Sequence, residues 1–170
     1  MELNKAEQKT TVSINFVPES DKFVGAAKEY RGIWLKNGEK IIKTIEQVSS
    51  LNFLIRQLEA TIYEGKSQSH PLRLRASNSK EIKQTALIHE LCHILFVDNH
   101  LKFELEIHKV LNLILYDTLE DLYGKGLADN NVQAESKLSP EYKEAWEWTL
   151  AFNKEERGQK LEELLKIVCE

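Results

Sequence analysis

Cysteine, methionine and proline are scarce in this chain, which has two, one and three of them in 170 residues. The two cysteines, Cys92 and Cys169, are too few for the disulfide framework of a small secreted protein. The sequence has no run of about 18 apolar residues, so it predicts neither a membrane span nor a membrane partner. Residues 1–11 are polar and lack the apolar core of a signal peptide, and we therefore expect a cytoplasmic protein.

An excess of basic residues is also lacking. Lysine and arginine number 23 against 27 acidic residues, which gives a net charge of −4 and an isoelectric point near 5.8. Since nucleic-acid-binding domains carry a basic patch, this balance argues against a nucleic-acid partner. Hydrophobic residues make up 42% of the chain, which is enough to form the core of one domain. The sequence does not indicate an oligomeric state.

The residues from His89 to His93 read H-E-x-x-H. On a helix, side chains four positions apart lie on one face with Cβ atoms about 5–6 Å apart, so both histidines can bind one metal ion. Zinc is commonly held in this way, at about 2.0–2.1 Å from each imidazole nitrogen. Glu90 is rotated by about 100° from His89, and from there it can take a proton from a zinc-bound water. Two metal ligands and one base in five residues are typical of zinc peptidases.

The motif requires a helix, and its flanks predict one over residues 79–97. Asn78 is a suitable N-cap, with Glu81 placed to complete a capping-box-like pair. Asp98 and Asn99 provide a stop. Apolar residues recur through the segment at helical spacing, namely Ile82, Ala86, Leu87, Leu91, Ile94 and Leu95.

Upstream of the motif, the patterns mainly predict strands. Polar and apolar residues alternate over residues 11–17, which predicts a strand. Residues 30–35 and 40–45, joined through Asn-Gly, predict a β-hairpin with a type I′ turn. Residues 51–63 favour a helix, and a strand is the alternative. Leucine and arginine alternate over residues 72–75, which predicts an edge strand that either pairs with an extended peptide substrate or protects the edge with solvated arginines.

Downstream of the motif, helices predominate. An apolar stripe over residues 101–122 predicts a strong second helix. Residues 127–138 are interpreted as a polar connection. Two further helices are predicted over residues 142–152 and 155–168.

A catalytic zinc site usually has three protein ligands and an open position for water, so a third ligand must come from elsewhere in the chain. Metzincins supply it within H-E-x-x-H-x-x-G-x-x-H. Here Phe96 and Asn99 occupy the glycine and last histidine positions, and Met1 is the only methionine, so no Met-turn can form. The metzincin arrangement is therefore excluded, and His100 lies one place too late for it.

Residues 72–122 resemble the ImmA/IrrE-type metallopeptidases and the short zinc peptidases of phages and mobile elements. The shared features are H-E-L-x-H near the end of one helix, the approach over residues 83–88, and a glutamate, Glu106, at the head of the next helix. That family shows a pattern like E-A-N-x-F-A-x-x-L-L, and Ile107 and His108 here replace its small pair. The resemblance implies a gluzincin-type site with Glu106 as third zinc ligand, and a regulatory substrate such as a repressor.

The residues themselves leave the third ligand open. The candidates are Glu106, Glu104, His100, His108 and Asp117. Asp117 is also a candidate to accept a hydrogen bond from a ligand histidine, at the ring nitrogen that does not bind the metal. A hydrogen-bond donor to the substrate carbonyl would complete a catalytic site, and the eligible side chains are Tyr116, Tyr123 and His108.

Together these features indicate an α+β fold. We expect a zincin-like single domain in which a small, mostly antiparallel sheet packs on the motif helix and C-terminal helices follow. Residues 1–127 are expected to form the zincin-like metallopeptidase core. Residues 128–170 are expected to form a helical extension packed on the same domain.

The expected activity is that of a hydrolase. Zinc held by His89, His93 and Glu106 would activate a water, with Glu90 as general base, for attack on a peptide bond of a protein or peptide substrate. The alternative is a zinc-binding interaction module with vestigial or no catalysis, which a fourth protein ligand would favour. A third class is a zinc hydrolase that acts on a small amide or nucleotide.

Overall fold

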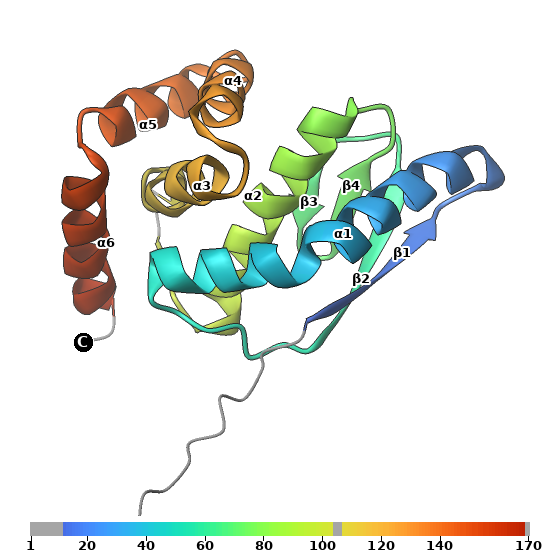
Figure 1. Ribbon diagram of the computed structural model, residues 1–170, viewed down its shortest axis with the longest axis horizontal. Coiled ribbons are helices and arrows are strands. Elements are labelled where there is room, and N and C mark those ends of the chain that lie inside the picture. Colours follow the sequence, from blue (N-terminus) through green and yellow to red (C-terminus); the bar gives the residue numbers. More distant parts are fainter. Residues whose placement is uncertain (1–11, 104–106, 169–170) are drawn as a thin grey trace, which may run out of the picture.

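The computed structural model describes residues 12–103 and 107–168. It is an α+β single domain in which helices outweigh a small sheet (Figure 1). The strands are β1 (Ser13–Pro18), β2 (Gln57–Tyr63), β3 (Gln68–Ser69) and β4 (Leu72–Arg75). The helices are α1 (Val24–Ser49), preceded by a 3-10 turn (Asp21–Phe23), α2 (Lys80–Asp98), α3 (Ile107–Tyr123), α4 (Lys125–Glu135), α5 (Pro140–Leu150) and α6 (Lys154–Val168). Among these residues, no helix is both long and apolar enough to cross a bilayer.

The sheet is mixed, with the strand order β1-β2-β4-β3. β1 and β4 both run parallel to β2, whereas the short β3 is antiparallel to β4. The prediction of a mostly antiparallel sheet is therefore wrong, because α1 is a crossover that returns the chain from β1 to a parallel β2. β4 is confirmed as a strand, but it lies between β2 and β3 and is not the predicted edge.

Residues 30–45, predicted as a β-hairpin, lie within the single helix α1, so that prediction is wrong. Buried side chains recur at helical spacing, namely Tyr30, Ile33, Ile41, Ile42 and Ile45. Gly38 makes no turn: a Cβ there would lie 2.8 Å from the ring of Trp34, so the glycine leaves room for that ring. The burial of one long apolar stripe thus overrides the turn preference of Asn-Gly.

Residues 51–63 divide into a loop and the strand β2. The strand begins at Gln57 and has a hydrogen-bonded neighbour on each side. The loop before it is held by α2, because the Asp98 carboxylate accepts a hydrogen bond from the backbone N–H of Ile55 at 2.8 Å. The helix prediction for this segment is therefore wrong and the strand alternative is confirmed, as is the strand predicted over residues 11–17.

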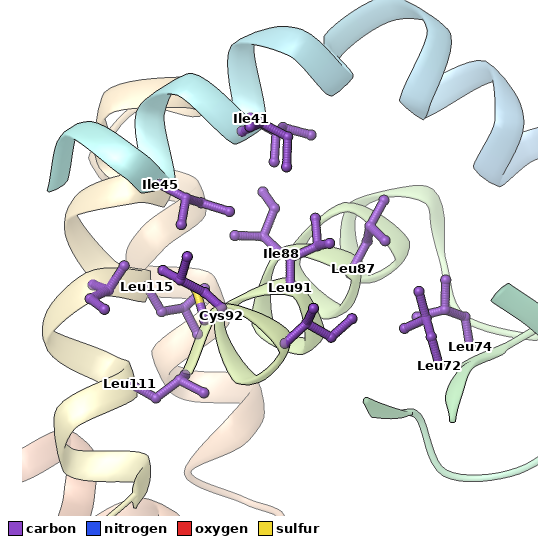
Figure 2. Close-up of a cluster of buried hydrophobic side chains, with 14 of the residues drawn as sticks. Ile41, Ile45, Leu72, Leu74, Leu87, Ile88, Leu91, Cys92, Leu111 and Leu115 are labelled. Carbon is purple, nitrogen blue, oxygen red and sulfur yellow. The ribbon is translucent and has the colours of Figure 1, made fainter. Parts of the chain in front are cut away.

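α2 is the central helix, and its predicted bounds are correct to within one residue. Its N-cap is Ser79 rather than Asn78, because the Ser79 hydroxyl accepts the backbone N–H of Ile82 at 3.3 Å. Its C-cap is Asn99. Figure 2 shows apolar residues of α2 surrounded by those of α1, β4 and α3, and the labelled residues are Ile41, Ile45, Leu72, Leu74, Leu87, Ile88, Leu91, Cys92, Leu111 and Leu115.

α3 packs against α1, α2, α4, α5 and α6, and every residue from 110 to 119 is buried. Residues 127–138, interpreted above as a polar connection, form most of α4, and the expected boundary at residues 127 and 128 falls inside this helix. That interpretation was wrong because the buried residues of α4 are small or polar, namely Ala128, Asn131 and Glu135. The last two predicted helices are confirmed as α5 and α6.

Candidate metal centre

Three histidines meet where α2 and α3 pack together. His89 and His93 lie one turn apart on α2, and His108 lies in the first turn of α3. One ring nitrogen from each lies within 4.8 Å of the other two. The three side chains are therefore close enough to hold one metal ion.

The spacing of the α2 pair fits a tetrahedral metal. The Nε2 atoms of His89 and His93 are 3.2 Å apart. Two nitrogens bound tetrahedrally at about 2.0–2.1 Å from zinc would be about 3.3–3.4 Å apart. The separation of the α2 pair is therefore close to that of two zinc ligands, and the His108 nitrogen lies within 4.8 Å of both.

The ring of His89 is oriented by a carboxylate and an indole from the C-terminal helices. Its Nδ1 donates a hydrogen bond to Glu135 Oε1 at 2.8 Å, and the other oxygen of Glu135 accepts the indole N–H of Trp146 at 2.9 Å. Since a carboxylate accepts and does not donate, the proton of the neutral ring sits on Nδ1. The lone pair of the neutral ring is then on Nε2, which lies 3.2 Å from His93 Nε2.

The protonation of the other two histidines suits metal binding, which requires neutral imidazole. Burial, together with the charge on His89, lowers the pKa of His93 to about 3 and that of His108 to about 4. Burial acts in the same downward direction on the pKa of His89, but the Glu135 carboxylate outweighs it and raises that pKa overall.

Glu90 is buried beside His89 and lines a pocket of about 320 Å³ that also borders His89, Glu135 and Tyr142. Burial raises the pKa of its carboxyl group. Among the described residues, its carboxylate has no hydrogen-bond partner. A carboxylate of raised pKa that faces a pocket and has no partner there is suited to accept a proton from a substrate or water.

Tyr142 is a hydroxyl donor at the site that the sequence analysis did not select. Its ring lies 4.4 Å from that of His108, centroid to centroid, and burial raises its pKa to about 12, so the phenol keeps its proton at neutral pH. Of the tyrosines proposed from sequence, Tyr116 bonds Asp129, and neither Tyr116 nor Tyr123 borders the pocket.

The structure distinguishes some of the candidate third ligands. His108 joins the cluster and His100 does not. Glu104 and Glu106 lie outside the described residues, so the assignment of Glu106 stays a prediction.

Asp117 is part of a different buried interaction. Its carboxylate is hydrogen-bonded to the Arg157 guanidinium, with Oδ1 2.7 Å from Nη2. The partner of a cluster histidine is instead Glu135. Sequence reasoning missed Glu135, Tyr142 and Trp146 as site residues. For Glu135 a clue was available, because residues 125–135 contain no proline and can therefore form a helix.

Comparison of the chain with protein-family models, curated proteins and solved structures finds no match. The histidine cluster and its pocket are therefore the features from which a function can be inferred.

Proposed function

We propose that this protein is a zinc-dependent metallopeptidase in which His89, His93 and His108 hold the metal and Glu90 is the general base. The observation that carries the proposal is the convergence of three imidazole nitrogens within 4.8 Å, beside a pocket lined by Glu90. Imidazole ligands suit zinc, copper, iron and nickel, and three of them with an open fourth position are a common catalytic zinc arrangement. A glutamate such as Glu90, which lines the pocket and is not one of the three clustered histidines, has no use in a purely structural site.

In the proposed reaction, the zinc ion, Glu90 and Tyr142 have separate roles. A bound zinc ion would supply Lewis acidity and lower the pKa of a coordinated water toward about 7. Glu90 accepts the proton of the attacking water and delivers it to the leaving amine. The Tyr142 phenol donates a hydrogen bond to the carbonyl oxygen as negative charge develops there.

The pocket supports a peptide substrate with an apolar side chain. Two of its lining residues are apolar and exposed, since Ile82 is 43% and Leu138 65% accessible to solvent. An apolar substrate side chain that covers them would remove their apolar surface from water, which favours binding. A specific protein, such as a repressor or another regulator, is proposed as the substrate, consistent with the resemblance noted in the sequence.

The test combines metal analysis with one isosteric substitution. Wild-type protein is expected to contain about one zinc per chain and to cleave peptides in a proteome-derived library, with cleavage read by mass spectrometry. Glu90→Gln should keep the zinc and lose cleavage, whereas Glu59→Gln, on the exposed face of β2, should change neither. Full cleavage by the Glu90→Gln protein would refute the role of Glu90, and zinc binding without cleavage by wild type would favour an interaction module.

A further inference from the structure

We propose that Glu135 is a positioning residue that fixes the ring of His89 for metal binding, and that Trp146 holds Glu135 in place. The inference rests on the metal site proposed above. It assigns a role in that site to α4 and α5, the helices that follow the three histidines in the chain.

The contacts form one chain of hydrogen bonds across three helices. His89 on α2 donates to one oxygen of Glu135 on α4, and Trp146 on α5 donates to the other, at 2.8 and 2.9 Å. All three residues are at least nine-tenths buried, so water competes little for these groups. One carboxylate oxygen thus accepts from His89 and the other from Trp146, and these two hydrogen bonds fix the orientation of the carboxylate.

This arrangement selects one of two ring tautomers. A neutral imidazole carries its proton on either Nδ1 or Nε2, and a proton on Nε2 would occupy the lone pair that must bind the metal. The acceptor at Nδ1 keeps the proton on the far side of the ring. It also increases the basicity of Nε2 and prevents the ring from rotating out of the cluster.

The decisive variant is Glu135→Gln, which has nearly the same shape. An amide offers one acceptor oxygen and one NH2 donor, so it cannot accept from both His89 and Trp146. Zinc affinity, measured by competition with a chromogenic chelator, is expected to fall about 10- to 100-fold, the usual effect of losing such a partner. Adding Trp146→Phe removes the competing donor, lets the amide oxygen turn to His89, and should restore part of the lost affinity.

The matched control is Asp117→Asn. Asp117 is a buried carboxylate like Glu135, but it bonds Arg157 and no histidine of the cluster. This variant should lower the midpoint of thermal unfolding and leave zinc affinity within twofold of wild type. A general effect of disturbing the core would instead lower zinc affinity in both variants alike.

A second readout does not require metal. In metal-free wild-type protein, at a pH high enough for the ring to be neutral, nitrogen-15 NMR should find the His89 proton on Nδ1. The Glu135→Gln protein should show a mixture of both tautomers. A folded Glu135→Gln protein with unchanged zinc affinity, or a wild-type ring with its proton on Nε2, overturns the proposal. Failure of wild-type protein to bind zinc would instead remove the proposed function, and the tautomer measurement would still test Glu135.

Discussion

Replacing His108 by alanine tests the proposal that this residue, in the first turn of α3, is the third metal ligand. Structural zinc sites with four ligands bind with about 10–16 kcal/mol, so one ligand contributes about 3 kcal/mol, or on the order of 100-fold in affinity. At zinc about 1,000 times above the wild-type Kd, binding stabilises wild type by about 4.1 kcal/mol and the variant by about 1.4 kcal/mol. For 170 residues, these correspond to rises in Tm of about 11 °C and about 4 °C.

The assay is thermal unfolding followed by circular dichroism, with and without zinc, for each protein. The zinc-induced rise is compared rather than Tm itself, because His108→Ala also removes the packing of the His108 ring against Tyr142. His100→Asn is the matched control, since His100 is outside the cluster and asparagine tolerates its positive φ of 58°. A His108→Ala protein that keeps the full zinc-induced rise would show that another side chain, such as Glu106, completes the site.

Further predictions concern pH and the buried ion pair. His93 and His108, with pKa values lowered to about 3 and about 4 chiefly by burial, should stay neutral near pH 5 in the metal-free protein, as read from imidazole proton shifts. Because these pKa values lie below the ~6.5 of unfolded histidine, both residues should lower the free energy of unfolding as the pH falls below about 6.5. The pKa of His89 is raised, so this residue should increase the free energy of unfolding as the pH falls. Arg157→Met should lower the free energy of unfolding in urea by about 3–5 kcal/mol, because it leaves the Asp117 carboxylate buried without its partner. A loss below about 1 kcal/mol would mean that water reaches this carboxylate.

The parts of the fold that the sequence predicted correctly are those encoded by local signals. α2 has a capping residue, an uninterrupted apolar pattern and a polar stop, all within its own length. α1 has an equally regular pattern of buried residues, but its Asn37-Gly38 pair carries the strongest short-range hairpin signal. The packing of Trp34 over Gly38 explains the glycine, and this contact is not visible in the sequence.

The candidate site also contains residues that a local sequence signal indicated and residues that depend on the packing of distant segments. His89, Glu90 and His93 follow from one helical turn and were identified from the sequence alone. His108 could be named only as one of several candidates, because its position depends on how α3 packs against α2. Glu135 was missed altogether, since a polar residue that points inward gives no apolar periodicity to detect.

The placement of His108 predicts that the proposed metal site is already assembled in the metal-free protein. α3 contacts five other helices, and its residues from 110 to 119 are all buried, so the apolar core holds the helix in place. The His89 ring is likewise hydrogen-bonded to Glu135, whose other carboxylate oxygen accepts from Trp146. A site organised by the core differs from a zinc finger, in which the metal itself drives folding. The metal-free protein should therefore keep the far-ultraviolet circular dichroism of the loaded protein after chelation, and lose only the stability that binding adds. Loss of most of its helical signal on chelation would show that the metal, rather than the core, brings α2 and α3 together.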